Sequence, residues 1–483
     1  MRVGRLCTLF CVLAFLFALA PALAGSASDA VTQDEASQIV HTQSRNEYAL
    51  LIGVDYFVSR ADTYPSSTNN VNAMQEVFQG ALNPFRAIIV PPNPVTTVEQ
   101  LTALIQKAFG AAQEGDVCYL YLSTHGVYDP ASGQEPMLLL SDGQTENGVT
   151  PAQLEAAFDG IDGTKVLILD ACNSGAFIGK GLPSLPEQVH FLGDDFKVLT
   201  SSGALEESWY WSVDDQNEAG TAGQGSFYFT QALVQSLSAA YGYPADQNRD
   251  GCVVLSELYE YLVLNHAAST PQVYPQSDDF VVFRYDASQP LPTGLARAPI
   301  MDVTFSGTTL SRTSRQITIE FIAMRPVRVA YQVVYQRDGK WEFDHAQLIY
   351  DEAERFTAYG DQPGAISAGR KVRTLTLGEL DEGVYGYAMV QLVTIDQGKL
   401  TVHAGRVISI PPDTADMTLT ASVADTFDPS GGRELSIFIG HEYPCALSVS
   451  ILDEEEQVVH RLCHRQSTRP MQMNPEGTVL NWN

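Results

Sequence analysis

Apolar residues follow two different patterns along this chain, and the change between them divides it into parts. Up to about residue 287, continuous apolar runs alternate with segments whose apolar residues recur at helical spacing. Such runs indicate strands buried on both faces, because a half-exposed strand would alternate apolar and polar residues. The apolar runs are 48–57, 85–90, 116–123, 165–170, 196–203 and 278–286; the helical segments are 69–82, 96–113, 150–161, 226–240 and 256–269. This order predicts one α/β domain over 46–287, with a doubly wound, mostly parallel sheet and helices on both faces.

Beyond a proline-containing linker at 287–300 the apolar residues alternate with period two and show no helical spacing. The clearest examples are RQITIEFIAM, VRVAYQVVYQ, VYGYAMVQLVTI and KLTVHAGRVISI. Alternation of this kind predicts an antiparallel β-sandwich over 295–411. A second linker, PPDTADMT, precedes a smaller β-domain at 413–483.

The first residues have the features of a targeting segment. Arg2 and Arg5 precede the apolar run LCTLFCVLAFLFALA, and Ala22 and Ala24 provide a small-residue cleavage site. We therefore expect a signal peptide at 1–24, cleaved after Ala24, followed by a flexible leader at 25–46. An uncleaved membrane anchor is the alternative, although the apolar run is near the lower limit for spanning a bilayer. No later stretch is apolar enough to insert stably, so we expect a secreted or periplasmic protein.

Net charge and cysteine count narrow the classes of function. The formal charge of −29 excludes nucleic acid as an expected partner, because phosphate binding needs clustered Lys and Arg. Removal of the signal peptide leaves an odd number of cysteines, so at least one thiol stays unpaired. Cys445 and Cys463 flank two β-patterned arms around an acidic turn. Facing positions in such a hairpin would allow a disulfide, and two independent buried thiols are the alternative.

Two of the buried strands end in chemically reactive residues. DVCYLYLS runs into His125 and Gly126, and KVLILD runs into Ala171 and Cys172. Catalytic groups collect beyond the carboxyl ends of parallel strands, so both side chains are expected at one rim of the sheet. There Cys172 would act as a nucleophile and His125 as its acid–base partner. The N–H groups of Gly126 and Cys172 would bind the oxyanion of a tetrahedral intermediate.

The pair of motifs HG and DACNSG, each after an apolar strand, resembles the caspase-like cysteine peptidases, the group that holds caspases, metacaspases, legumain, clostripain and gingipains. ALLIGVDYF is similar to the first strand of metacaspase-type catalytic domains, and LTSSGALEESWYW to their substrate-pocket strand and loop. The resemblance covers about 46–287 and is nearest to the bacterial metacaspase-like type. It implies a peptide-bond hydrolase with a dyad of His125 and Cys172, assisted by the N–H of Gly126.

The same resemblance places a substrate pocket around acidic and polar residues. Asp55 follows the first strand, Asp170 ends the strand before the nucleophile, and Glu206, Glu207 and Ser208 lie in the pocket loop. A carboxylate at the floor of such a pocket favours Arg or Lys before the scissile bond. Solvated surface charges at 206 and 207 are the alternative.

The stretch DQNRDGCVVLSE at 246–257 fits a calcium-binding loop. The expected ligands are Asp246, Asn248, Asp250, the carbonyl oxygen of Cys252, and Glu257. The incoming helix is broken by YGYPA, so we expect a half-site with a structural or activating Ca²⁺ ion. A polar β-turn is the alternative, and no organic cofactor is expected.

LSVSILDEEEQVVHRLC and the final VLNWN resemble immunoglobulin-like repeats of the flagellar hook-capping type, which would bind a surface or a partner. Together these features predict an exported cysteine endopeptidase that acts on polypeptides. A non-catalytic, calcium-braced adhesion scaffold is one alternative. A transpeptidase that uses the same dyad is another.

Overall fold

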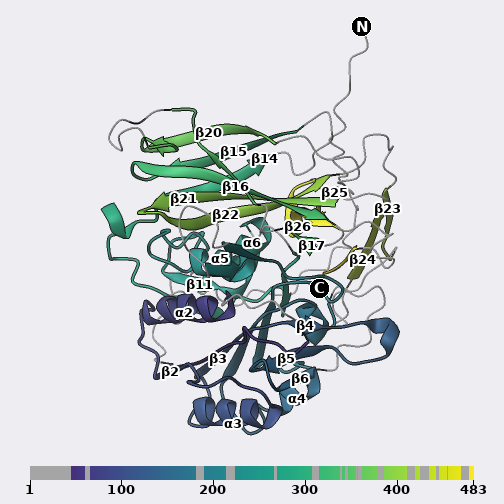
Figure 1. Cartoon of the computed structure of the whole chain (residues 1–483). Coiled ribbons are helices and arrows are strands. Elements are labelled where there is room, and N and C mark those ends of the chain that lie inside the picture. Colours follow the sequence, from purple (N-terminus) through teal and green to yellow (C-terminus); the bar gives the residue numbers. More distant parts are fainter. Residues whose placement is uncertain are drawn as a thin grey trace.

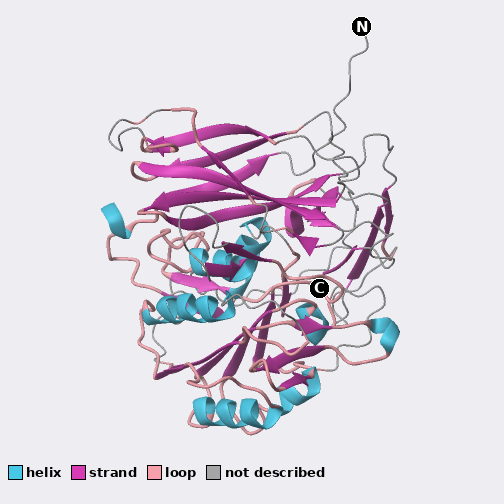
Figure 2. Cartoon of the chain, in the orientation of Figure 1, coloured by secondary structure: helices cyan, strands magenta, loops and turns pink. Residues whose placement is uncertain are grey.

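The computed structural model stacks an α/β unit under a β-sandwich, with a small β unit beside them (Figures 1 and 2). The structure describes residues 45–59, 66–180, 190–213, 224–265, 269–306, 315–337, 340–342, 346–354, 356, 362–377, 386–410, 419–424, 435–441, 445–453, 455–468 and 478–482. The predicted signal peptide and nearly all of the predicted leader lie outside these residues. No helix in the described part of the chain is long and apolar enough to cross a membrane.

The α/β unit is built on a six-stranded sheet in the order β12-β8-β7-β3-β1-β2. All neighbouring pairs are parallel except β12 with β8. The strands are β1 (Glu47–Gly53), β2 (Ala87–Ile89), β3 (Val117–Ser123), β7 (Thr164–Asp170), β8 (Phe196–Thr200) and β12 (Gln272–Tyr274). Every residue of β3 is buried, as its unbroken apolar run predicts for a central strand. The predicted doubly wound, mostly parallel sheet is confirmed.

Helices cover both faces of this sheet. One face carries α2 (Ser66–Gln79), α5 (Tyr228–Ser236) and α6 (Leu255–Asn265), and the other carries α3 (Val98–Phe109) and α4 (Pro151–Ala156). Helix α4 begins where the sequence predicts, because Thr150 and Gln153 form a capping box around Pro151. In Figure 1, α2, α5 and α6 lie between the central sheet and the β-sandwich.

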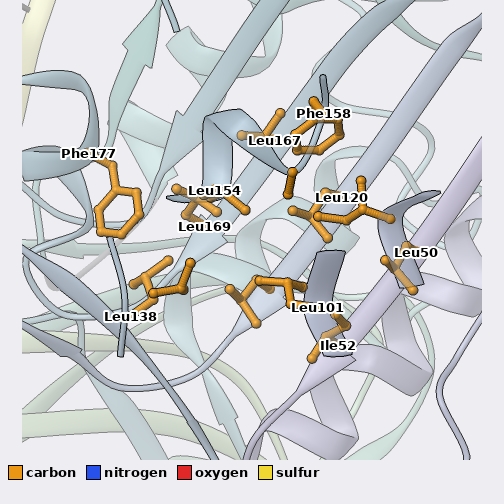
Figure 3. Packing of buried hydrophobic residues seen from close by; sticks show 14 of the residues in the cluster. Leu50, Ile52, Leu101, Leu120, Leu138, Leu154, Phe158, Leu167, Leu169 and Phe177 are labelled. Atoms are coloured by element: carbon orange, nitrogen blue, oxygen red, sulfur yellow. The ribbon is translucent and has the colours of Figure 1, made fainter. Parts of the chain in front are cut away.

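Alternate residues of the central strands fill two separate cores. Figure 3 shows the core under α3 and α4, where Leu50, Leu120 and Leu167 from three adjacent strands meet Leu101 and Phe158. The intervening residues, such as Leu51 and Tyr121, pack against α2, α5 and α6. Because both faces are buried, the three middle strands have a fixed register, and the positions of their carboxyl ends are fixed with it.

The α/β unit and the linker that follows it also contain shorter elements. They are β4 (Gly126–Val127), β5 (Met137–Ser141), β6 (Glu146–Val149), β9 (Tyr210–Val213), β10 (Gln224–Phe227), β11 (Cys252–Val254) and β13 (Val281–Arg284), with 3-10 turns η1 (Pro130–Ser132), η2 (Ser174–Ile178) and η3 (Gly294–Ala296). Strands β4, β5 and β6 form an antiparallel arm that leaves directly from His125. Strands β9 and β10 form an antiparallel hairpin, and the residues just before β9 contact Cys172.

The β-sandwich has two antiparallel sheets. One contains β14 (Ile300–Ser306), β15 (Gln316–Ala323) and β20 (Gly369–Thr376). The other contains β16 (Val327–Arg337), β17 (Lys340–Trp341), β21 (Gly386–Asp396) and β22 (Lys399–Ile410), with β18 (Gln347–Tyr350) and β19 (Ala365–Ile366) paired to β16. The inner faces form one core, and the outer face of the second sheet is also buried.

The last unit consists of β23 (Leu419–Ser422), β24 (Leu435–His441) and β27 (Thr478–Trp482), and of the hairpin β25 (Cys445–Leu452) with β26 (Val458–Thr468). Its strands are antiparallel, as predicted for a second all-β unit. The prediction of a disulfide in this hairpin is wrong. Several bulges shift the register, so Cys445 faces Thr468 while Cys463 faces Val449. The Cys463 sulfur contacts the Leu447 carbonyl oxygen at 3.7 Å.

Candidate active site

His125 and Cys172 leave two neighbouring strands at the same level. In the parallel pair of β3 and β7, Ser123 is the partner of Asp170, so each reactive residue lies two positions beyond a paired residue. A hydrogen bond of 3.1 Å from the Thr124 N–H to the Asp170 carbonyl oxygen continues the ladder past the strand ends. Because adjacent strands are about 5 Å apart, the register brings the two residues to one rim, as the sequence predicts.

Gly126 lies against the backbone of the nucleophile candidate. A Cβ atom at this position would be 1.7 Å from the Cys172 carbonyl oxygen, so no other residue fits without moving one of the two chains. Close backbone approach is therefore the structural reason for glycine here. The contact locks the segment after β3 to the segment after β7.

A tight turn presents the Cys172 side chain, which is half-buried. Asn173 adopts a left-handed conformation with φ of 57°, and its side chain donates to the Ala204 carbonyl oxygen at 2.8 Å. The Cys172 thiol donates to the carbonyl oxygen of Ser208 at 3.5 Å. The loop before β9 thus runs directly alongside the thiol.

The His125 ring is held by neighbours that the sequence did not reveal. The ring of Phe57 meets it edge to face, with 4.5 Å between centroids. Glu146 lies near the ring. Burial raises the pKa of its carboxyl, whereas hydrogen bonds from the segment of Val58 and Ser59 and the charge of the His125 imidazole lower this pKa. The net shift of the Glu146 pKa is downward. Glu146 comes from β6, which reaches the rim only through the β4–β6 arm.

A pocket opens next to His125. It is lined by Val54, Asp55, Phe57, Ser66, Ser67, Thr124, His125, Tyr210 and Phe227. Asp55 is there as predicted, and its carboxylate also accepts the N–H groups of Ser67 at 2.7 Å and of Thr68 at 3.1 Å, so that it caps α2. Burial raises the pKa of Asp55, and these hydrogen bonds offset part of the rise.

Asp170 lies fully buried below the rim. Its two carboxylate oxygens accept hydrogen bonds from the hydroxyls of Ser208 at 3.2 Å and Thr230 at 2.6 Å. Thr230 is bonded in turn to the Tyr121 hydroxyl. Burial raises the pKa of Asp170 to about 6, and the hydroxyl donors hold it below what burial alone would produce.

The pocket-loop residues have different positions. Ser208 contacts both Cys172 and Asp170, as described above. The carboxylate of Glu206 is bonded within the protein. It accepts the N–H groups of Gly203 at 3.1 Å and Thr270 at 2.8 Å, and these hydrogen bonds stabilise the loop. Glu207 is exposed. The sequence could not place Glu206, because its partner Thr270 is distant along the chain.

Sequence reasoning did not identify the two aromatic residues of the pocket wall. Tyr210 on β9 and Phe227 on β10 are partners in the hairpin, with ring centroids 5.8 Å apart. The aromatic cluster in ESWYW was a signal for this wall, but it does not say which ring faces the pocket.

In the predicted calcium loop, the Asp and Asn side chains accept hydrogen bonds from the loop's own backbone. Asp246 accepts the N–H groups of Arg249 at 2.7 Å and Gly251 at 3.0 Å, and Gly251 is left-handed with φ of 87°. Burial raises the pKa of Glu257, and the carboxylates of Asp246 and Asp250 raise it further. Asn248 and Asp250 bond to one another, and Asp250 accepts the Cys252 N–H. Among the described residues no three acidic, His or Cys side chains converge to hold a metal ion.

Comparison with known proteins adds the family. Among solved structures, a structural-genomics protein of Geobacter sulfurreducens is 14% identical with a TM-score of 0.34, covering 50% of this chain and 100% of its own. Caspase-1 of Spodoptera frugiperda is 15% identical with a TM-score of 0.32, covering 52% and 94%. No curated protein matches. A family model described as the caspase domain matches residues 46–400, which extends beyond the α/β unit into the β-sandwich. The chain belongs to the caspase domain family, whose members are generally cysteine peptidases.

Proposed function

We propose that this protein is an exported cysteine endopeptidase that cleaves polypeptides after Arg or Lys, with Cys172 as nucleophile and His125 as acid–base partner. The observation that carries the proposal is the shared rim: the register of β3 and β7 and the contact of Gly126 with the Cys172 carbonyl oxygen bring the backbone segments of His125 and Cys172 side by side. Membership of the caspase domain family supports the reaction class. Export rests on the first residues, and mass measurement of the mature N-terminus would test cleavage after Ala24.

The proposed reaction follows from these groups. The Cys172 thiolate attacks the scissile carbonyl carbon, and the C=O electron pair moves to oxygen, where the N–H groups of Gly126 and Cys172 stabilise the charge. His125 gives its proton to the leaving amine as the C–N bond breaks. Water, deprotonated by His125, then hydrolyses the thioester and restores the thiol. Phe57 packs edge to face against the imidazole, and Glu146 lies near enough to interact with it electrostatically.

The proposed preference for basic residues rests on two buried carboxyl groups beneath the rim. Asp55 lines the pocket beside His125, and Asp170 is buried below the rim, where it accepts hydrogen bonds from the hydroxyls of Ser208 and Thr230. An Arg or Lys side chain would supply the positive charge that these carboxylates lack. We assign the main charge recognition to Asp170 and Asp55, and no role to the carboxylate of Glu206, which is occupied by the loop.

We expect Asp170→Asn to lower kcat/KM for arginine substrates by about 100-fold, because the arginine would lose its buried counter-charge. With the native enzyme, kcat/KM for these substrates should fall as pH falls through about 6, where the raised pKa of Asp170 lets the carboxyl take up a proton. The surrounding groups are the hydroxyls of Ser201, Ser208, Thr230 and Tyr121, which do not ionise in this range. Peptide-library profiling between pH 5 and 8 measures both effects.

The matched control is Asp286→Asn, an exposed carboxyl outside the rim that bonds only to its own turn. Selectivity for arginine that survives Asp170→Asn, or a preference for Asp or Asn before the cleaved bond, would refute the acidic-pocket assignment.

Calcium remains a separate proposal for the loop 246–257. Its support is the ligand order of the sequence, the left-handed Gly251, and the mutual repulsion of Asp246, Asp250 and Glu257, which a cation would relieve. We expect Ca²⁺ at 100 times its dissociation constant to stabilise the fold by about 2.7 kcal/mol. Thermal unfolding with Ca²⁺ or EDTA measures this, and Asp250→Ala should remove the difference. Equal melting temperatures for the native chain in both buffers would exclude a calcium site here.

A further inference from the structure

The β9–β10 hairpin has two buried faces with different neighbours. Tyr210 and Phe227 line the pocket beside His125. The residues next to them in the chain, Trp209, Trp211 and Tyr228, are buried in an apolar cluster with the β-sandwich, and Tyr210 also packs against this cluster. This division follows the alternation of side chains along a strand.

Specific contacts join the second face to the sandwich sheet. The ring of Trp209 meets that of Tyr387 on β21 edge to face, with centroids 5.9 Å apart. The Gln391 side-chain amide donates to the Tyr228 hydroxyl at 2.7 Å. Both Tyr387 and Gln391 are buried. Helix α5 adds two bonds, from Gln231 to the Val402 carbonyl oxygen and from Gln235 to the His403 carbonyl oxygen, at 2.6 and 2.8 Å.

The same segments carry the two hydroxyls that bond to Asp170. Ser208 directly precedes Trp209, and Thr230 follows Tyr228 by two residues. Ser208 also accepts the Cys172 thiol through its carbonyl oxygen. Displacement of Trp209 or Tyr228 would therefore move the pocket wall and the groups around Asp170 together.

We infer that the β-sandwich supports the wall of the substrate pocket, with Tyr387 and Gln391 as positioning residues that hold the β9–β10 hairpin against the catalytic rim. The sandwich thus affects substrate recognition through the position of the hairpin, in addition to any binding surface of its own. The substrate part of this inference rests on the proposed peptidase function, whereas the holding of the hairpin does not.

The test compares two ring-to-leucine changes in the full-length chain. Tyr387→Leu removes the ring that faces Trp209. Phe321→Leu is the matched control, because Phe321 is equally buried but lies in the internal core of the sandwich. With Tyr387→Leu we expect KM for arginine peptides to rise about tenfold with a smaller change in kcat. Phe321→Leu should leave KM unchanged, and Tyr387→Phe, which keeps the ring, should behave like the native protein.

A second readout needs no cleavage. In a background with Trp341→Phe and Trp482→Phe, acrylamide quenching reports only Trp209 and Trp211. Tyr387→Leu and Gln391→Leu should increase quenching at least twofold at a temperature where the fold is intact, and Phe321→Leu should not. Unchanged quenching in Tyr387→Leu, or an equal rise in Phe321→Leu, overturns the inference. If quenching rises selectively but neither the variants nor the native protein cleave peptide, the inference that the sandwich holds the hairpin is supported and the peptidase proposal fails.

Discussion

Replacement of Cys172 by alanine is expected to lower kcat for peptide cleavage by at least 1000-fold, while the melting temperature changes little. The side chain is half-buried in a turn that is held by the left-handed Asn173 and its bonds to the carbonyl oxygens of Ala204 and Glu206, so removal of one sulfur leaves the backbone in place. The loss is large because the nucleophile has no substitute at the rim, and removal of one member of a catalytic unit removes most of its effect. Steady-state cleavage of an arginine peptide measures it.

Cys463→Ala is the matched control, since it removes a buried thiol from β26, which the rim does not include. Residual cleavage by Cys172→Ala within tenfold of the native rate would contradict the assignment of the nucleophile and favour a non-catalytic scaffold.

Gly126→Ala is expected to be almost as severe, although it adds a single methyl group. The new Cβ atom would lie 1.7 Å from the Cys172 carbonyl oxygen, so the segments after β3 and β7 must separate. Overpacking of this kind typically costs about 1–3 kcal/mol of stability, and a shift of about 1 Å at a catalytic group costs about 100-fold in rate. We expect both effects, measured by thermal unfolding and by kcat/KM.

Gly80→Ala is the control for this change. It introduces the same methyl group after α2, where the nearest atom to the new Cβ is 3.4 Å away. Native activity in Gly126→Ala would show that the two segments can separate without consequence, and the account of the rim would be wrong.

The sequence predicted those features that depend on local patterns. Continuous apolar runs such as DVCYLYLS predict burial on both faces, and the structure shows β3 and β7 buried in the middle of the sheet. Once both strands are central and parallel, their carboxyl ends meet, so His125 and Cys172 could be expected at one rim before any coordinates.

The remaining features depend on partners that are distant in the chain. Glu206 was predicted to lie in the substrate pocket, but its carboxylate accepts a hydrogen bond from Thr270. The direction of Trp209 is set by Tyr387 in a different domain, which no pattern within the loop can reveal. Cys445 and Cys463 were spaced for a hairpin disulfide, but bulges in β25 and β26 move the register, and bulges have no reliable sequence signal.

The most direct test of the shared rim is the rate at which iodoacetamide alkylates Cys172 between pH 5 and 9, followed by mass spectrometry in the native chain and in His125→Ala. His190→Ala serves as the control, because His190 contacts Glu155 of α4. We predict that native Cys172 reacts well below pH 8.5, near which an ordinary thiol ionises, and that His125→Ala alone shifts the reaction to higher pH. Identical pH–rate curves for the native chain and His125→Ala would contradict the account.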